Sequence, residues 1–252
     1  MLSPRALEDL ADRCLRSRQP LWTGFLAPQA WEDALRRLAG REDLQLQAEG
    51  GHPRAERRRL GFSLGQATEG TEERPDPAPP PLGLLDLTGD FLFDPASARA
   101  VTAALQQLGA AADDLGDVLL RGDRGGLLIV TPELQGRLDG QPVQVGSVAA
   151  RLAAAPWERL NPQPLQERIV TTVEASLRLD AVASAGFGLS RSRLADLIRQ
   201  GRVRIDWQPV TSPSRELRLG QRVQLEGRGE LELLTADLTR RDRWRLQLRR
   251  RS

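Results

Sequence analysis

Five residues between positions 190 and 204 have types and spacing suited to holding a charged ligand: Ser190, Arg191, Arg193, Arg202 and Arg204. Ser190 precedes a stretch with helical periodicity, and a serine there caps a helix whose free backbone N–H groups favour a phosphate. Two arginines follow at the start of that helix, and two more alternate with apolar residues on the strand expected after it. Guanidinium groups grip phosphate through paired hydrogen bonds and stack on unpaired bases. The segment is therefore typical of a surface that binds a polyanion.

Most other chemistry is excluded by residue types that the chain lacks. All 36 basic residues are arginines and there is no tyrosine. Without lysine the chain has neither a GxxxxGK phosphate loop nor a Schiff-base nucleophile. Cys14 is the only cysteine and His52 the only histidine, which excludes an internal disulfide and a zinc site of three or four such ligands. No acid and nucleophile accompany His52, so we expect it to be structural, and we expect no cofactor or metal.

Positive charge gathers at the C-terminal end of the chain. Residues 170–252 hold 17 arginines against 10 acidic residues, a net charge of +7, whereas residues 1–169 have a net charge of −5. A basic domain joined to an acidic one indicates a polyanionic partner for the C-terminal third. The sequence shows no signal-type segment and no apolar run near the roughly 20 residues that a membrane helix needs. We therefore expect a soluble cytoplasmic protein without membrane insertion.

Prolines divide the chain into three folded blocks. Residues 65–83 contain five prolines and no aromatic residue, a composition typical of an extended spacer. Three more prolines interrupt residues 155–164. The predicted organisation is an N-terminal helical and hairpin region over 1–66, a proline-rich linker over 67–81, a central domain over 82–160 and a C-terminal domain over 170–252.

The first two blocks mix helical and strand periodicity. The N-terminal block is expected to hold helices at 4–18 and 28–38 and a strand at 44–50, followed by a basic run, Arg57–Arg59, that could touch RNA or form a solvated edge. The central block is expected to hold a strand at 82–89, a helix at 96–108, a hairpin at 116–130, a short helix at 131–138 and a last strand at 142–152. This order predicts a ferredoxin-like sandwich of the RNA-recognition-motif type, although the aromatic base-stacking sequences of that motif are missing.

The C-terminal block is expected to begin with two helices, at 174–185 and 191–200, and to continue as strands. Alternation on the first of these strands places Val203, Ile205 and Trp207 inward. Further strands are expected near 222–227, 231–236 and 242–250. Arg249–Arg251 is expected to be a disordered tail that adds only non-specific attraction. The predicted fold class of the whole chain is α+β.

Three short motifs follow one another in the C-terminal block. They are Arg178-Leu179-Asp180, Ser190-Arg191-Ser192, and Leu197-Ile198 with Gly201 and Val203 after it. Residues 177–229 therefore resemble the RNA-binding domain first described in ribosomal protein S-four. Residues 50–59, 87–109 and 116–120 are similar to the YlmH-like family, and 173–198 is similar to its cyanobacterial and plastid branch, the photosystem II S-four domain proteins.

This resemblance implies both an architecture and a function. The architecture is an N-terminal region, a central domain like the RNA-recognition motif, and a C-terminal S-four domain of two helices and a small sheet. The function is non-catalytic binding of structured RNA, rRNA or tRNA, on the large ribosomal subunit, in translation or in ribosome-associated quality control. The implied RNA-binding residues are Arg178, Ser190, Arg191, Ser192, Arg193, Arg199, Arg202, Arg204 and Arg228.

The sequence departs from the S-four pattern at two places. Asp206-Trp207 stands where Asn-Gly is common, and tryptophan is poor at the positive φ of such a turn. Glu230 follows Arg228 at an edge that tends to be basic in relatives.

Two alternative functions stay open. Arg178-Leu179-Asp180 also matches the catalytic motif of pseudouridine synthases, in which Asp180 would be the nucleophile of an RNA-modifying enzyme. The catalytic domain of that class is absent, so we expect Asp180 to be structural and to pair with an arginine. The second alternative is a photosystem II assembly factor that acts through protein contacts.

Overall fold

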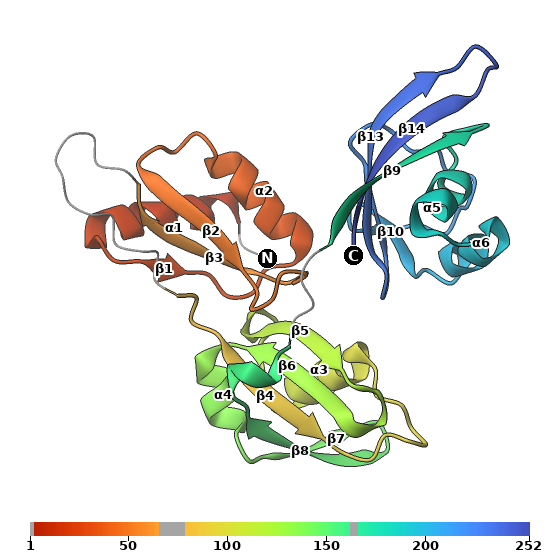
Figure 1. The fold of residues 1–252 in the computed structure, drawn as a ribbon. Helices are drawn as coiled ribbons and strands as arrows, with labels where there is room; N and C mark the ends of the chain where they lie inside the picture. Colours follow the sequence, from red (N-terminus) through yellow and green to blue (C-terminus); the bar gives the residue numbers. More distant parts are fainter. Residues whose placement is uncertain (1–2, 66–78, 162–165) are drawn as a thin grey trace. The chain divides into compact units, whose positions relative to one another are not determined.

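The computed structural model of the chain describes residues 3–65, 79–161 and 166–252. It forms two compact units, Met1–Pro162 and Gln163–Ser252, each of mixed helix and strand (Figure 1). The predicted α+β fold class is confirmed. Most of the proline-rich linker predicted over 67–81 lies outside the described residues. Among the helices in the described ranges, none is long and apolar enough to cross a membrane.

The N-terminal part of the first unit packs two helices on a three-stranded antiparallel sheet. Its elements are α1 (Pro4–Ser17), β1 (Leu21–Trp22), α2 (Pro28–Leu38), β2 (Leu44–Glu49) and β3 (Arg59–Leu64). The hydroxyl of Ser3 begins α1 by accepting a hydrogen bond from the Ala6 backbone N–H at 3.2 Å. Apolar residues at helical spacing in both helices meet the buried Leu60 and Phe62 of β3. The strand order is β1-β3-β2.

The central part of the first unit is an antiparallel sheet with two helices on one face. Its elements are β4 (Gly83–Thr88), α3 (Ala98–Gln107), β5 (Leu115–Leu120), β6 (Gly125–Val130), α4 (Pro132–Leu138), β7 (Pro142–Val145) and β8 (Val148–Ala154). The order β5-β6-β4-β8-β7 is the predicted ferredoxin-like arrangement with β7 added at one edge. Residues 142–152, predicted as one strand, form a hairpin because Gly146 turns the chain at φ +61°.

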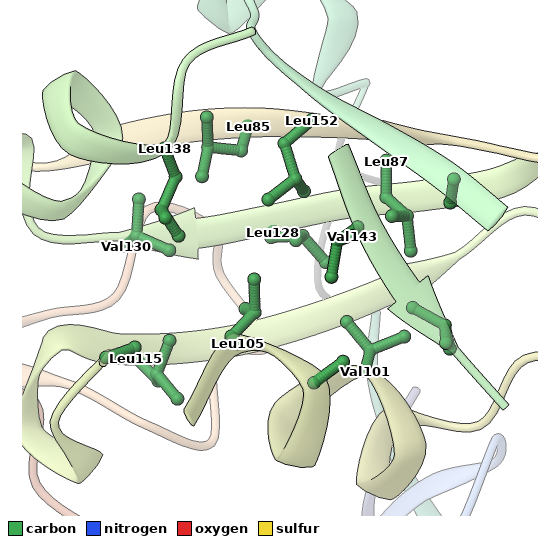
Figure 2. Close-up of a cluster of buried hydrophobic side chains, with 14 of the residues drawn as sticks. Leu85, Leu87, Val101, Leu105, Leu115, Leu128, Val130, Leu138, Val143 and Leu152 are labelled. Carbon is green, nitrogen blue, oxygen red and sulfur yellow. The ribbon is translucent and has the colours of Figure 1, made fainter. Parts of the chain in front are cut away.

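Both faces of this central sheet are covered. Leu128 of β6 lies in the core with Leu105 of α3 (Figure 2). On the opposite face, Leu127 and Ile129 pack with Phe25 of the N-terminal part. All six residues of β6 are buried, which suits its uninterrupted run of glycine and aliphatic residues. The two parts of the first unit therefore share a core.

The basic run Arg57–Arg59 fastens these two parts together. Arg57 donates a hydrogen bond from Nε to the Leu115 carbonyl at 2.6 Å, and Arg59 donates from Nε to the Thr23 carbonyl at 2.6 Å. Burial lowers the pKa of both guanidinium groups. Arg58 lies over the ring of Trp31, at 4.9 Å from its centre. The contacts of these side chains inside the first unit contradict the solvated edge that was one predicted role of the run, and the RNA contact stays a prediction.

The second unit packs two helices on one face of a six-stranded antiparallel sheet. Its elements are β9 (Glu167–Glu174), α5 (Leu179–Phe187), α6 (Arg191–Arg199), β10 (Val203–Ile205), β11 (Gln208–Pro209), β12 (Arg222–Leu225), β13 (Gly229–Leu238) and β14 (Trp244–Arg251). The strand order is β11-β10-β12-β13-β14-β9. Leu179 of α5 and Ile198 of α6 are fully buried against Leu246 and Leu248 of β14. This architecture confirms the predicted two helices and small sheet.

Two sequence predictions for this unit are wrong. The helix predicted to begin at Glu174 begins at Leu179, and residues 167–174 form β9. The unbroken run of β-branched residues over 169–173 favours a strand there, and the partner strand β14 is distant in the sequence. Arg249–Arg251 is no disordered tail but the end of β14. Arg249 and Arg251 form ion pairs with three carboxylates, those of Glu167, Glu230 and Glu232.

The turn between β10 and β11 keeps a tight geometry despite its tryptophan. Asp206 and Trp207 have φ values of +48° and +67°, as in a type I′ turn. The Asp206 carboxylate accepts hydrogen bonds from the Arg222 backbone N–H at 3.0 Å and from Gln221 Nε2 at 3.1 Å. The backbone N–H of Trp207 donates a hydrogen bond to Gln224 Oε1 at 3.1 Å. Trp207, predicted to point into the core, therefore lies half-buried in the turn.

Two helical glycines should respond to alanine in opposite directions. A Cβ at Gly186 in α5 would lie 2.4 Å from a methyl carbon of Leu231, which is buried and cannot move away, so Gly186→Ala should destabilise by about 1–3 kcal/mol. A Cβ at Gly136 in α4 meets nothing within 4 Å, so Gly136→Ala should stabilise by about 0.5–1 kcal/mol. Urea unfolding of the full chain measures both. A stabilising Gly186→Ala would contradict the close approach of α5 to the sheet.

Candidate nucleic-acid interface

One nearly buried carboxylate, that of Asp180, joins the starts of the two helices of the second unit. Its side chain is 8% exposed. Arg178 donates from Nε to Oδ1 and from Nη2 to Oδ2, both at 3.1 Å. Arg191 donates from Nε to Oδ2 at 3.1 Å and from Nη2 to Oδ1 at 3.2 Å. Two guanidinium forks therefore share both oxygens of a single carboxylate.

The charges of this cluster support one another. Burial opposes ionisation of Asp180, but the hydrogen bonds from Arg178 and then Arg191 outweigh it, and the pKa of Asp180 lies below its usual value. The hydrogen bond to Asp180 likewise raises the pKa of Arg178. The carboxylate of Asp180 and the guanidinium group of Arg178 therefore stabilise each other in their ionised forms.

Local structure places the two arginines side by side. Arg178 is the residue before α5, and Arg191 is the first residue of α6. Ser190 caps α6, because its hydroxyl accepts a hydrogen bond from the Arg193 backbone N–H at 3.3 Å. The loop that holds Arg215 backs the start of α5, since the Leu179 N–H donates to the Arg215 carbonyl at 2.7 Å. The cluster is thus set by two helix starts and one loop.

The exposed edges of the two forks can bind an anion. The side chains of Arg178 and Arg191 remain 40% and 55% exposed. Each uses Nε and Nη2 on Asp180, which leaves the N–H groups of Nη1 to donate elsewhere. Asp180 restricts both side chains to one orientation before any ligand arrives, which reduces the entropy lost on binding. The arrangement is suited to phosphate groups.

Three other predicted residues lie on α6. Ser192 Oγ is 3.3 Å from Ser190 Oγ at the helix start. Arg193 is exposed and, within the described residues, its side chain has no hydrogen-bond or ion-pair partner. Arg199 lies in the last turn, eight residues or about 12 Å from Arg191, and forms an exposed ion pair with Asp196 at 2.8 Å. Ser192 and Arg193 therefore accompany the Asp180 cluster, and Arg199 does not.

The strand arginines point elsewhere. Arg204 lies between the buried Val203 and Ile205, so it faces away from α5 and α6. Arg202 forms an exposed ion pair with Glu226 at 3.1 Å. Arg204 therefore faces the other side of the sheet from Arg178 and Arg191, and Arg202 is engaged by Glu226.

Arg228 belongs to a second positive cluster. It is exposed in the turn between β12 and β13. Burial, followed by the like charges of Arg168 and Arg228, lowers the pKa of Arg250. Arg250 lies over the ring of Phe187, at 5.7 Å from its centre. Three guanidinium groups thus gather near the end of α5.

Sequence reasoning missed several exposed arginines of this unit. Arg215 lies in the loop behind α5, and the run TSPSRE around it has the two serines and one proline of a turn, a signal that could have indicated it. Four more surround the tip of the β13–β14 hairpin: Arg240, Arg241, Arg243 and Arg245.

The lone histidine has a partner that the sequence does not reveal. His52 Nε2 lies 3.1 Å from Asp117 Oδ2. Asp117 also accepts hydrogen bonds from the backbone N–H groups of Glu56 at 2.8 Å and Arg57 at 3.0 Å. The Asp117 carboxylate on β5 therefore holds the loop that follows β2 in place. In the parts of the chain that the structure describes, no group of three or more His, Cys, Asp or Glu side chains could hold a metal ion.

Comparison with known proteins places two domains on the chain. A family model described as "YlmH, N-terminal" matches residues 5–65, and the S4 domain model matches residues 177–223. The chain combines a YlmH-type N-terminal domain with an S4 domain. The S4 match spans the Asp180 cluster and every predicted RNA-binding residue except Arg228. The resemblance to YlmH-like proteins is confirmed, and the narrower cyanobacterial and plastid branch stays a prediction.

Two individual proteins are similar to the chain. The Ribosome-associated protein quality control protein P2 of Bacillus subtilis (strain 168) is 27% identical over 229 residues, which cover 90% of this chain and 86% of that protein. The solved structure of cell division protein YlmH from Streptococcus pneumoniae aligns with a TM-score of 0.48 and 15% identity. That alignment covers 63% of this chain and 92% of that chain.

Asp180→Asn should weaken binding of RNA by the S4 domain although it makes the chain more positive. Simple attraction predicts tighter binding when a carboxylate is neutralised. We expect at least about fivefold weaker binding, because asparagine offers the two arginines one uncharged acceptor oxygen in place of the two carboxylate oxygens that order them. Filter binding with purified tRNA at fixed salt measures the change. Binding as tight as that of the unaltered chain would contradict the ordering role of Asp180.

The same substitution should reveal a pH-dependent contribution to stability. Because the folded-state pKa of Asp180 is depressed, its ion pairs contribute fully above the ordinary value of about 3.9 and are lost as pH falls through the folded value. At neutral pH Asp180→Asn should lower the free energy of unfolding by about 1–2 kcal/mol. The loss is no larger because solvent screens the charges of the half-exposed arginines. Urea unfolding should show that the difference in stability between the unaltered chain and the variant decreases as the solution is made acidic. A gap that widened in acid would contradict the depressed pKa.

Proposed function

We propose that the chain is a non-catalytic RNA-binding protein of the ribosome, whose S4 domain holds structured RNA on the large subunit. The single observation that carries this proposal is the pair of arginine forks ordered by Asp180 at two helix starts. Paired, pre-oriented guanidinium groups match phosphates spaced along a folded RNA backbone. The S4 match at these residues supports the same assignment.

The similarity to a ribosome-associated protein supports the cellular setting. The name of the Bacillus subtilis relative ascribes to that protein ribosome-associated quality control, and the match covers most of both chains. We infer the same process for this chain, with rRNA of the large subunit and tRNA as the RNA partners. This role would place the chain in the cytoplasm.

The geometry gives no support to a nucleophilic role for Asp180. A pseudouridine-synthase-like aspartate must reach its substrate with a free oxygen, whereas Arg178 and Arg191 engage both oxygens of Asp180 and its side chain is nearly buried. Asp117 holds two backbone N–H groups beside His52, which suits a structural dyad. A role in photosystem II assembly stays a prediction from the sequence.

The proposal predicts that the two forks carry most of the RNA affinity of the S4 domain. Arg178→Ala and Arg191→Ala should each weaken tRNA and ribosome binding several-fold and should lower the salt slope by about one. Arg37→Ala is the matched control, since it also removes one exposed arginine from a helix surface but lies in α2 of the first unit. Ribosome co-sedimentation with RNase treatment and filter binding at several KCl concentrations measure both effects.

Two results would overturn the proposal. One is an unaltered chain that neither co-sediments with ribosomes nor binds tRNA. The other is normal binding by both fork variants, each with an unchanged circular dichroism spectrum. Arg199→Ala provides an internal comparison, because its exposed ion pair with Asp196 predicts a smaller effect than loss of either fork.

A further inference from the structure

The tip of the β13–β14 hairpin is an ordered projection of the S4 domain sheet. The Thr239 N–H donates to the Arg243 carbonyl at 2.7 Å, and the Asp242 N–H donates back to the Thr239 carbonyl at 3.1 Å. The Arg243 N–H also donates to the Thr239 hydroxyl at 3.2 Å. Asp242 has a φ of +54°, a left-handed conformation that aspartate tolerates. In Figure 1 this hairpin extends beyond α5 and α6.

Arginines at the two ends of this hairpin differ in their surroundings. At the base, Arg249 lies 3.2 Å from Glu232, and Arg251 lies 3.0 Å from Glu167. At the tip, Arg240, Arg241 and Arg243 are exposed, and no carboxylate of the described residues forms an ion pair with any of them. Carboxylates of the protein therefore pair with the arginines at the base of the hairpin, whereas the three tip arginines form no such ion pair.

The tip arginines surround a hollow of about 990 Å³. Its lining includes one carboxylate, that of Asp237, which stands opposite Arg245 in the strand register. Two aliphatic side chains, Val173 at 46% and Leu238 at 60% exposure, line it as well. The lining of the hollow therefore combines an excess of positive charge with a small apolar surface.

The tip lies at the same end of the sheet as the Asp180 cluster. Glu174, the last residue of β9, pairs with Trp244 at the start of β14. Arg178 follows Glu174 by four residues, so their Cα atoms are at most about 14 Å apart. The base of the hairpin tip and the Asp180 cluster are therefore joined by a short segment of chain at one end of the sheet, within reach of a single folded RNA.

We propose that the hairpin tip is a second RNA contact, in which Arg240, Arg241 and Arg243 bind the sugar–phosphate backbone of the RNA held by the S4 helices. The proposal rests on the proposed function. The contact is independent of base sequence, because guanidinium groups on an exposed turn reach phosphates and not the edges of stacked bases. Val173 and Leu238 support the aliphatic stems of the arginines and the ribose face of the backbone.

RNA fits this surface better than a lipid membrane does. A membrane-binding projection inserts large apolar side chains, and aromatic residues are typical of it. The lining of the hollow contains no aromatic residue among the described side chains, and four of its eight residues are arginines.

The test compares two triple variants of the full chain that lose the same charge. The tip variant is Arg240→Ala/Arg241→Ala/Arg243→Ala, which leaves Arg245 opposite Asp237. The control variant is Arg13→Ala/Arg16→Ala/Arg37→Ala, three exposed positions on α1 and α2. Filter binding with deproteinised large-subunit ribosomal RNA, from 0.05 to 0.3 M KCl, gives the affinity and the salt slope. Vesicles of phosphatidylglycerol and phosphatidylcholine form a second probe, with circular dichroism as the check of fold.

The tip variant should bind this RNA about tenfold more weakly near 0.15 M salt, with the salt slope lower by two to three, while the control changes little. A tip variant that binds like the control, while the fork variants are impaired, would overturn the hairpin contact and leave the proposed function intact. Tip-dependent binding of vesicles with unchanged RNA binding would also overturn it. An unaltered chain that binds no RNA would overturn both proposals.

Discussion

The carboxylate of Asp180 is the contact on which the binding surface of the S4 domain depends. Arg178 and Arg191 begin different helices, and without a shared acceptor their long side chains would sample many rotamers. A nearly buried carboxylate with fewer partners is unfavourable, because its desolvation is then uncompensated. The requirement to satisfy Asp180 therefore brings the two helix starts together. One interaction thus determines both local packing and the direction in which positive charge faces solvent.

Arginine serves three physical purposes in a chain without lysine. Arg57 and Arg59 use their planar donors to satisfy backbone carbonyls inside the first unit. Arg249 and Arg251 join three strands through carboxylates on the open face of the second sheet. Arg178, Arg191, Arg193 and the hairpin-tip arginines keep exposed donors. Net charge alone cannot separate these groups, since only the third contributes positive charge that a polyanion can reach.

Elements set by local signals were predictable from the sequence. The Ser190 cap, the helix of residues 191–199 and the ferredoxin-like order of the central part all follow from caps and periodicity over short windows. The partner strand of β9, β14, is distant in the sequence, although the unbroken run of β-branched residues in β9 is a local signal for a strand. The Val145-Gly146-Ser147-Val148 turn was also visible locally, and reading through it merged two strands into one.

The sequence indicates which residues belong to the candidate site better than it indicates which of them lie together. The motifs indicate Arg178, Asp180 and Arg191 and predict an arginine partner for Asp180, but the predicted helix over 174–185 puts Arg178 and Asp180 inside a helix and not at its start. That Arg191 shares this carboxylate depends on how α5 packs against α6, which periodicity does not determine. The partners of Arg249 and Arg251 lie on other strands, so composition alone indicated a tail where the structure has a paired strand.

The most direct test of the central claim is to map where RNA touches the chain on the ribosome. Ultraviolet crosslinking of the ribosome-bound full chain, followed by mass spectrometry of its peptides, locates the contacts without any substitution. The account predicts crosslinked peptides around Arg178, Arg191 and Arg215, which border the Asp180 cluster. Crosslinks confined to the first unit, with none between residues 178 and 215, would contradict it.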